Sequence, residues 1–381
     1  MNIQNLYKNF KTKFIDISKI SSIRKVSNLN LKTKKIIYRK VKNSSDLKNV
    51  LSDTDYVLDY NNDIPNNKKI SNFLNKEKFY KFKLIAILGG SQPNFFNFNL
   101  KEKAFFLSIF FFNVFKYRKF LFIIIMLKNF LIIYFQRSIK KINPYFYYNY
   151  VLVSDDICEK KANNYYINSK KIYVHYKDYE RHLLRDDNKL YYNNYAVFLD
   201  ESLFDHPDAR ILNLYHFLNL RRNKKTYYKS LRNFFDNFES ATNTEIIIAM
   251  HPKSFMSDKD CNKNFNRRII RNNSYNLLKK SKIVFSHAST SISYAIILEK
   301  PIIFLNSSLM FDIRHFTKIL SFSIATGGKI IDINNNNINY SNLFKKDFSL
   351  YKDYLSKYLK SSKSENKNFW DIVGSKLMLN N

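Results

Sequence analysis

The chain has 381 residues, of which 45% are hydrophobic and 17% aromatic, so it can bury two cores and is not a disordered chain. Its 64 Lys and Arg against 31 Asp and Glu leave a formal charge of +33, as expected of a protein that meets nucleic acid, an anionic membrane face or a polyanionic substrate. The lysines are spread along the chain, however, and Gly and Trp number only 5 and 1. An AT-biased genome produces this composition without selection on function, so both explanations of the charge stay open.

The two cysteines, Cys158 and Cys261, are too few and too isolated for a disulfide framework or a zinc site. No Asp-x-Asp motif follows a suitable strand, so no metal is expected. The first residues of the chain contain no apolar run that resembles a secretory signal. We therefore expect a cytoplasmic protein with no metal and no cofactor.

Three buried strands are predicted in the first part of the chain, at residues 83–88, 150–153 and 171–174. Gly89 and Gly90 follow the first of them directly, which indicates a turn where the backbone comes close to another group. Their spacing is not that of a dinucleotide-binding or phosphate-binding loop. We favour a tight turn between strand and helix, and keep a substrate-binding role for the two glycines as the alternative.

Residues 104–135 are the most apolar part of the chain. A bilayer span needs about 20 uninterrupted apolar residues, and Lys116, Arg118, Lys119 and Lys128 break this stretch into shorter pieces. We therefore predict no transmembrane helix. Two interpretations remain: helices buried in the core of the first domain, which we favour, or an aromatic and basic surface in peripheral contact with the anionic inner membrane.

A second series of strands is predicted at residues 195–199, 246–250, 283–285 and 301–305, with a helical pattern over 213–238. This order predicts a doubly wound α/β domain, in which ligands bind at the carboxyl ends of the strands. Terminal helices are predicted over 350–359 and 369–379. We divide the chain into an N-terminal domain at 1–190, a C-terminal domain at 191–340 and C-terminal helices at 341–381.

Polar residues that could carry chemistry follow three of these strands. His251 and Pro252 end one strand, where proline stiffens the turn and the imidazole faces the ligand edge. The alternative is a structural or solvated histidine. Ser289, Thr290 and Ser291 precede a predicted helix over 293–299, where hydroxyls and unpaired N–H groups suit a phosphate. The alternative there is an ordinary N-cap.

Carboxylates follow the strand at 195–199. Asp200, Glu201 and Asp205 could supply a base that meets an acceptor hydroxyl, or could form a solvated turn. The His-Pro motif and the Ser/Thr turn follow successive strands of one domain, so their coincidence favours a shared nucleotide-phosphate pocket.

The segments VFLDESLFDHPD, IIIAMHPKS and VFSHASTSISYAIILEKPIIF resemble, in order and spacing, the bacterial surface-carbohydrate and capsular-polysaccharide biosynthesis proteins with a glycosyltransferase-B fold. That group includes sialyltransferases, polysialyltransferases and Kdo transferases, which share an HP motif and a later Ser-Ser/Thr motif. The resemblance covers roughly residues 150–305. It implies an α/β protein with two Rossmann-like domains facing a central cleft, the acceptor in the first and the donor in the second.

The resemblance also implies roles for individual residues. His251 would contact the donor phosphate, Ser289 and Thr290 would bind the same phosphate, and Asp200 or Glu201 would be the base. A sialic-acid-like or Kdo-like sugar would pass from a CMP donor to a capsule, lipopolysaccharide or other surface glycan. Glu299 lies too late in its helix to replace the ribose-binding Glu of many such proteins, so the identity of the nucleotide stays open.

Other functions remain open as well. A sugar-nucleotide 2-epimerase of the same fold would need no acceptor. A basic nucleic-acid-binding protein is indicated only by the charge, and we expect no specific nucleic-acid partner. A non-catalytic scaffold on the membrane would bind no nucleotide at all.

Overall fold

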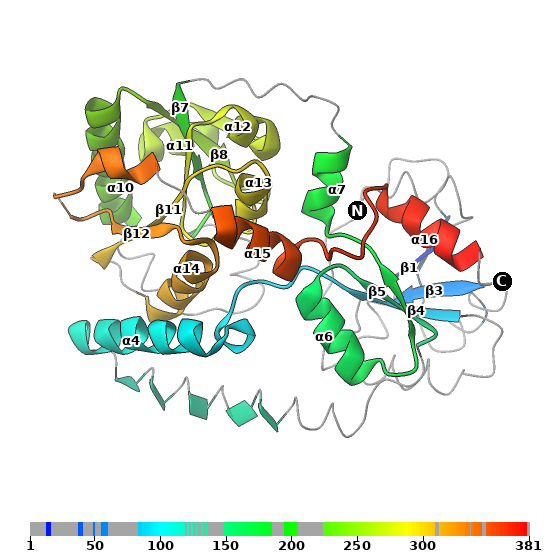
Figure 1. Cartoon of the computed structure of the whole chain (residues 1–381). Coiled ribbons are helices and arrows are strands. Elements are labelled where there is room, and N and C mark those ends of the chain that lie inside the picture. The colour runs from blue at the N-terminus through cyan, green and yellow to red at the C-terminus, as the bar shows by residue number, and fades with distance from the viewer. Residues whose placement is uncertain are drawn as a thin grey trace. The chain divides into compact units, whose positions relative to one another are not determined.

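A computed structural model of the chain describes residues 13–16, 37–40, 49, 55–59, 83–118, 148–184, 194–204, 224–308, 312–335, 337–344 and 348–378, together with 120, 121, 123, 124, 127, 128, 131, 132, 134 and 135. The chain divides into two compact units (Figure 1). Unit 1 comprises residues 1–91, 133–184 and 356–381, and unit 2 comprises 92–132 and 185–355. Both units are built on parallel sheets, so the predicted α/β class with two Rossmann-like domains is confirmed.

Unit 1 contains a four-stranded parallel sheet in the order β3-β4-β5-β6. Its strands are β3 (Tyr56–Asp59), β4 (Lys83–Leu88), β5 (Tyr150–Val153) and β6 (Lys170–Tyr173). A separate parallel pair joins β1 (Lys13–Asp16) and β2 (Ile37–Lys40). The helices of this unit are α6 (Asp156–Tyr165), α7 (Lys177–Leu183) and α16 (Phe369–Met378).

The last helix covers the sheet that the first half of the chain builds. Phe369, Trp370 and Val373 of α16 form one core with Ile85 of β4 and Leu152 of β5. Apolar residues three and four apart on a helix share a face, which is why these positions of α16 bury together. Residues 356–378 therefore fold with unit 1, although the sequence placed them after the second domain.

Unit 2 contains a six-stranded, fully parallel sheet in the order β12-β11-β10-β7-β8-β9. Its strands are β7 (Tyr195–Leu199), β8 (Glu245–Met250), β9 (Ile269–Arg271), β10 (Ile283–Ser286), β11 (Ile302–Asn306) and β12 (Lys329–Asp332). Numbered from β7, this is the 3-2-1-4-5-6 order of a Rossmann fold. The central strands are near-continuous apolar runs because helices cover both of their faces.

The helices of unit 2 lie on the two faces of this sheet. They are α10 (Lys224–Thr242), α11 (Asp258–Phe265), α12 (Ser274–Lys280), α13 (Ile292–Ile297) and α14 (Ile313–Thr326). Alternate strand residues such as Phe198 and Phe285 bury with α10 and α11, whereas the hydroxyl of Tyr195 donates to the carbonyl of Leu277 on α12. The 3-10 turn η3 (Tyr340–Phe344) packs on α10, and α15 (Phe348–Tyr358) follows it in the chain.

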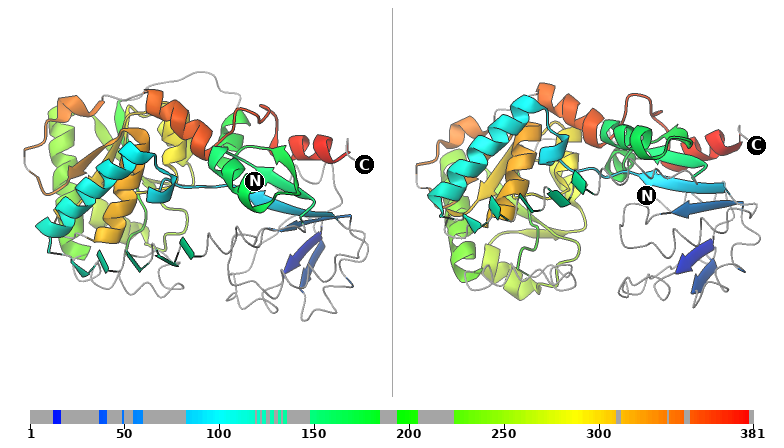
Figure 2. Two further views of the ribbon diagram at one scale, coloured as in Figure 1. Left: turned by 60° about the horizontal axis from the view of Figure 1, so that its bottom comes forward. Right: turned by 90° about the horizontal axis from the view of Figure 1, so that it is seen from below.

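The helix α4 (Leu100–Lys116) belongs to unit 2, whereas the sequence placed it in the first domain. It follows the short 3-10 turn η1 (Phe95–Asn97). Asn99 and Glu102 form a capping box that fixes its first turn. Phe106 and Phe110 pack against Phe316 of α14, and Figure 2 shows the two helices side by side.

The interpretation of residues 104–135 as buried core is correct for only one face of α4. Phe112 is 66% exposed, and the described apolar residues from 120 to 135 are almost all exposed as well. A helix that packs on one neighbour buries only the side chains that face this neighbour. When a helix is apolar on all sides, its apolar residues on the opposite face stay exposed. Among the helices that the structure describes, none is long and apolar enough to cross a membrane.

The predicted strand positions agree closely with the observed ones, and three of them, 83–88, 150–153 and 195–199, have the predicted bounds. The helix predicted over 293–299 is shorter and ends at Ile297. The boundary predicted near residue 190 and the first part of the helix predicted over 213–238 lie outside the described residues. A central cleft between the domains stays a prediction.

The aromatic core of unit 2 gives a first prediction. The ring of Phe285 lies 5.4 Å from that of Phe234 and 4.9 Å from that of Phe238, and all three are buried. We expect Phe285→Ala to lower the free energy of unfolding by about 3–5 kcal/mol, because the cavity cannot collapse among rigid rings. Urea unfolding measures this loss. Phe255→Ala, whose ring is 73% exposed, is the matched control and should change stability by less than about 0.5 kcal/mol.

Candidate functional site

The predicted site residues of unit 2 meet at one edge of the six-stranded sheet. The strand β7 pairs in parallel with β8 on one side and β10 on the other, so Leu199 lies opposite both Ala249 and Ser286. The next residue continues this register, because the N–H of Asp200 donates to the carbonyl of Ala249 at 3.1 Å. The carboxyl ends of the three strands therefore bring Asp200 and Glu201, His251, and the turn from His287 to Ser291 to the same edge. We call these residues the strand-end cluster.

This cluster lies at the point where the strand order reverses. β8 and β9 continue the sheet to one side of β7, while β10, β11 and β12 continue it to the other. In open α/β sheets the connections on the two sides of such a reversal pass to opposite faces of the sheet. Ligands of open α/β sheets bind at this reversal point, so the topology supports the position predicted from the sequence.

The carboxylate of Glu201 contacts two other segments of unit 2, the turn after β10 and the helix α14. The backbone N–H of Ala288 donates to its Oε1, and Nε2 of His315 lies 3.3 Å from its Oε2. Burial acts to raise the pKa of Glu201, but the hydrogen bond and charge of His315, with smaller contributions from His287 and Ala288, outweigh burial and hold the pKa below its ordinary value. Glu201 is therefore ionised at neutral pH and ties β7, β10 and α14 together.

His287 is a structural histidine. It is only 2% exposed, its Nδ1 lies 2.6 Å from the carbonyl of Leu305, and its Nε2 lies 2.5 Å from the hydroxyl of Tyr227. A carbonyl can only accept, so Nδ1 carries the proton and Nε2 accepts from Tyr227. Burial, and after it the neighbouring His315, lowers the pKa of His287 to about 4. The ring is neutral at physiological pH, and both its nitrogens are engaged.

His251 stands at the carboxyl end of β8 and is half-buried. Its Nδ1 accepts the backbone N–H of Lys253 at 3.1 Å, and its carbonyl accepts the N–H of Ser254 at 2.9 Å. Pro252 between them holds the tight turn that makes the first bond possible. With Nδ1 used as an acceptor, the neutral ring carries its proton on Nε2, which can donate to an anion at the sheet edge.

The Ser/Thr turn differs from its prediction in one respect. The sequence predicts unpaired backbone N–H groups here, but those of Ala288, Ser289 and Ser291 donate to the side chains of Glu201, Ser286 and Ser289. The helix α13 has only six residues, so its dipole would contribute little to binding an anion at its N-terminus. The hydroxyls of the turn differ in their access to a phosphate: Thr290 is exposed and Ser291 half-buried, whereas Ser289 is buried.

The remaining predicted residues fall in different places. Asp200 is 7% exposed, less open than Glu201. Asp205 lies outside the described residues. Gly89 and Gly90 belong to unit 1, where Gly90 has a positive φ of 75° and a Cβ added to it would stand 2.8 Å from the ring of Tyr176. That contact supports the tight-turn interpretation, and a substrate-binding role of the glycines stays a prediction.

Two functional candidates were missed by the sequence analysis. His315 lies in the first turn of α14, and Tyr227 lies on α10. A sequence signal existed for His315, since Asp312 three residues earlier is an N-cap whose side chain accepts the N–H of His315. No local pattern could have joined either residue to Glu201 or His287, because each contact links segments 60 or more residues apart.

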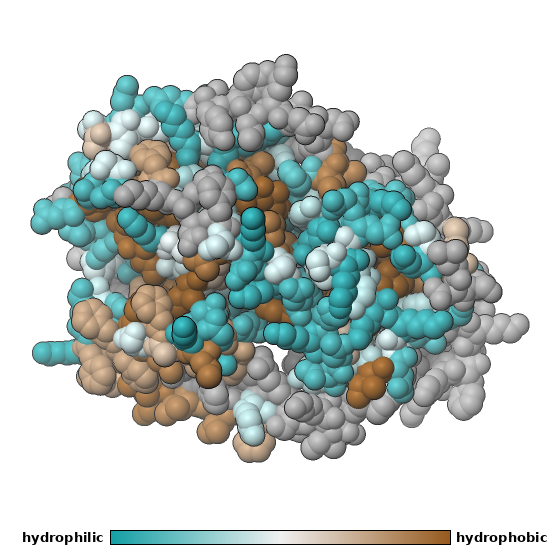
Figure 3. Space-filling model, viewed as in Figure 1, coloured by the Kyte–Doolittle hydropathy of each residue, from teal (hydrophilic) through white to brown (hydrophobic). Residues whose placement is uncertain are grey.

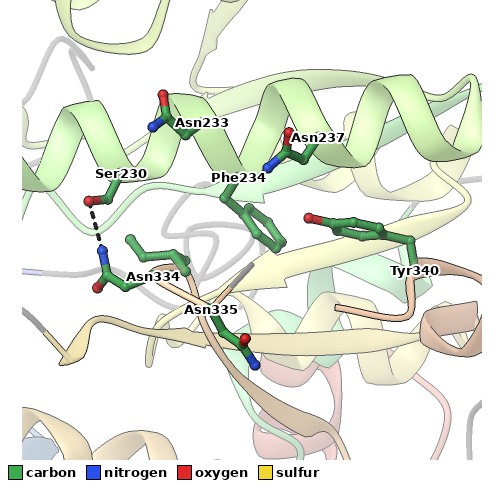
Figure 4. A pocket seen from close by; sticks show the side chains of 8 residues that line it. Ser230, Asn233, Phe234, Asn237, Asn334, Asn335 and Tyr340 are labelled. Carbon is green, nitrogen blue, oxygen red and sulfur yellow. Dashed lines mark hydrogen bonds between the residues drawn. The ribbon is translucent and has the colours of Figure 1, made fainter. Parts of the chain in front are cut away.

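A polar cavity of about 120 Å³ lies elsewhere in unit 2, between α10 and the loop after β12 (Figure 4). Asn233 and Asn237 line it from α10, and Asn334 and Asn335 from the loop. The amide of Asn334 donates to the hydroxyl of Ser230 at 2.8 Å. The polar side chains of the cavity are carboxamides and the hydroxyls of Ser230 and Tyr340, so this cavity lacks the carboxylate and imidazole groups of the strand-end cluster.

Metal and thiol chemistry find little support in the described parts of the chain. No group of three or more His, Cys, Asp or Glu among the described residues is placed to hold a metal ion. Cys158 and Cys261 are buried and unpaired with each other. Burial, with the charge of Asp155, raises the pKa of Cys158 to about 12, so its thiol is not a ready nucleophile.

No protein-family model and no curated protein matches the sequence. Among solved structures, the chain is similar to the wall teichoic acid polymerase TagF, with 10% identity and a TM-score of 0.47 over 99% of this chain and 82% of that one. It is also similar to the UDP-GlcNAc 2-epimerase of Methanocaldococcus jannaschii, with 13% identity and a TM-score of 0.43 over 91% and 86% of the two chains. The glycotransferase of kitacinnamycin matches at 9% identity and a TM-score of 0.34 over 81% and 71%. Similarity at this level assigns neither activity nor ligand to the chain.

The buried His287 predicts a pH dependence of stability. Its pKa rises on unfolding from about 4 to the ordinary value of 6.5, so the unfolded chain binds the proton first as the pH falls. The stability that neutral His287 contributes is present above pH 6.5 and is lost as the pH approaches 4, a loss of about 3 kcal/mol. We expect urea unfolding of His287→Gln to lack this part of the pH dependence.

His182→Gln is the control, because His182 lies on α7 in unit 1 and is partly exposed. It should keep the full pH dependence of the parent protein. If stability depended equally on pH in His287→Gln and in the parent, the assignment of His287 as neutral and hydrogen-bonded through both ring nitrogens would be wrong.

Proposed function

We propose that the protein is a glycosyltransferase and that the strand-end cluster of unit 2 binds its nucleotide-activated sugar donor. The observation that carries the proposal is the convergence of Glu201, His251 and the Ser289–Ser291 turn at the strand-order reversal of a Rossmann sheet. A nucleotide sugar needs an anion-binding edge and an acid–base group at the same place. The motif resemblance to glycosyltransferase-B proteins supports the same conclusion.

The leaving group would lie against β8 and the Ser/Thr turn. Nε2–H of His251 would donate to an oxygen of the donor phosphate, with the hydroxyls of Thr290 and Ser291 beside it. When the bond between the anomeric carbon and the phosphate oxygen breaks, the electron pair leaves with the nucleotide. A donor aimed at that oxygen stabilises the developing charge more than the ground state, so it accelerates departure.

The base would be the pair formed by Glu201 and His315. Glu201 stays ionised and fixes the imidazole of His315 through Nε2, as a carboxylate orients histidine in acid–base pairs. As the acceptor oxygen forms its bond to the anomeric carbon, its proton would pass to this pair. Asp200, which the sequence favoured slightly over Glu201 and Asp205, is more buried than Glu201 and is our second choice for the base.

The donor and acceptor follow from the resemblance and from charge. We propose a sialic-acid-like or Kdo-like sugar on CMP, transferred on the cytoplasmic side to a capsule, lipopolysaccharide or other surface glycan. The formal charge of +33 raises the local concentration of an anionic nucleotide sugar around the molecule.

Nucleotide binding is the first test. A ligand that binds only the folded state, present at about a hundred times its Kd, raises stability by about 2.7 kcal/mol. We expect a thermal shift of several degrees with CMP, UDP or GDP or their sugars, and a smaller shift in Thr290→Ala. No shift with any nucleotide would overturn the proposal and would favour a scaffold.

Transfer of the sugar is the second test. We expect His251→Ala to lower the turnover number about a hundredfold or more, because it removes a donor aimed at the leaving oxygen. His182→Ala should leave turnover unchanged. A product formed from the nucleotide sugar without any acceptor would show a 2-epimerase instead, and unchanged transfer in His251→Ala would remove this histidine from the mechanism.

The Glu201–His315 pair makes a third prediction. We expect Glu201→Gln and His315→Asn each to lower turnover by about 10²–10⁴-fold. The double variant should be no slower than the worse single one, because residues that act as a unit are not additive. Additive losses would show that the two side chains act separately, and melting temperatures would separate either result from simple unfolding.

A further inference from the structure

The surface of unit 2 carries an apolar face that no described residue covers. On α4, Phe106, Phe110 and Val114 point into the core with α14, while Phe105, Phe112 and Phe115 lie on the opposite side. These three rings are 56%, 66% and 60% exposed. Isolated exposed apolar residues are normal, but contiguous apolar patches mark interaction sites.

The face continues beyond the end of α4 through the described residues up to Ile132. Six large apolar side chains there are between 43% and 67% exposed, namely Phe120, Leu121, Ile124, Leu127, Leu131 and Ile132. Figure 3 shows apolar atoms gathered at the lower left of the molecule, where Figure 1 has α4. We call Phe105, Phe112, Phe115 and these six residues the α4 surface.

The exposed charges on α4 and the described residues after it are mostly positive, although Asp332 of β12 lies close enough to Tyr117 to act on its pKa. Lys101, Lys116, Arg118 and Lys128 are all exposed, and the only acidic residue from 100 to 132 is Glu102. Glu102 accepts the backbone N–H of Asn99 in the capping box, which places its charge at the start of the helix. A phenylalanine face with lysines at its border fits a layer that is anionic outside and apolar beneath, which is the arrangement of acidic phospholipids.

We propose that the α4 surface is a docking site for a bilayer that contains anionic phospholipids. Phe105, Phe112 and Phe115 enter the boundary between headgroups and acyl chains, and Lys101 and Lys116 contact the lipid phosphates. The long alkyl stems of the lysines lie along the apolar face while their ammonium groups reach the headgroups. This docking needs no nucleotide and no transfer reaction, so it stands or falls independently of the proposed function.

Flotation of the full chain with vesicles tests the proposal. We expect it to float with phosphatidylcholine vesicles that contain phosphatidylglycerol and to float poorly with phosphatidylcholine alone. The double variant Phe112→Ala, Phe115→Ala should bind the mixed vesicles more than about tenfold more weakly, because two rings no longer leave water. The double variant Lys101→Ala, Lys116→Ala should bind the mixed vesicles with about 20- to 30-fold lower affinity. Each basic residue contributes to the attraction by the negative membrane surface.

Phe255→Ala is the matched control, because Phe255 is as exposed as these rings but lies after β8, away from α4. It should float like the parent protein. Equal loss in Phe255→Ala and the α4 variants, or no binding to either vesicle by the parent, would overturn the proposal. Sedimentation velocity adds a further check: a dimer that dissociates in Phe112→Ala, Phe115→Ala without vesicle binding would identify the α4 surface as a contact between two copies.

Discussion

The pairing of β7 with a parallel neighbour on each side is the constraint on which the site depends. Because β8 and β10 both align with Leu199, every residue that follows these strands must leave the sheet at the same edge. Backbone hydrogen bonds in a buried parallel sheet leave no room for a slip of register, since one residue of slip would turn each side chain to the other face. The backbone pairing of the strands therefore helps to position His251 and Glu201, in addition to the contacts of their side chains.

Glu201 supports this arrangement and is also part of the base that we propose. Its carboxylate holds Ala288 and His315, and neither contact could be lost without leaving a charge in a partly buried place. His287 beside it is neutral and fully bonded, so it adds shape without adding charge. A neutral buried histidine next to an ionised carboxylate separates a supporting residue from one that can exchange a proton.

Charge and apolar surface act at different distances on this protein. The excess of Lys and Arg extends over the whole chain and draws anions of any kind at long range, with a reach of about 8 Å at physiological salt. The rings of α4 act only on contact. If an anionic bilayer holds the α4 surface, the excess of Lys and Arg would serve both that contact and the attraction of the anionic donor that we propose.

Local signals in the sequence were enough to predict the α/β class, seven of the strands and the polar residues at strand ends, because short apolar runs and His-Pro or Gly-Gly turns need no distant contact. His251, Glu201 and the Ser/Thr turn were identified in this way. Three features appear only in the folded chain: His315 meets Glu201, Tyr227 contacts His287, and the N–H groups of Ala288, Ser289 and Ser291 donate to side chains. These contacts join distant segments, and the free energy that selects them comes from packing across the whole sheet. The sequence likewise could not predict which face of α4 is buried. Both faces are apolar, and the face that packs on α14 is the buried one.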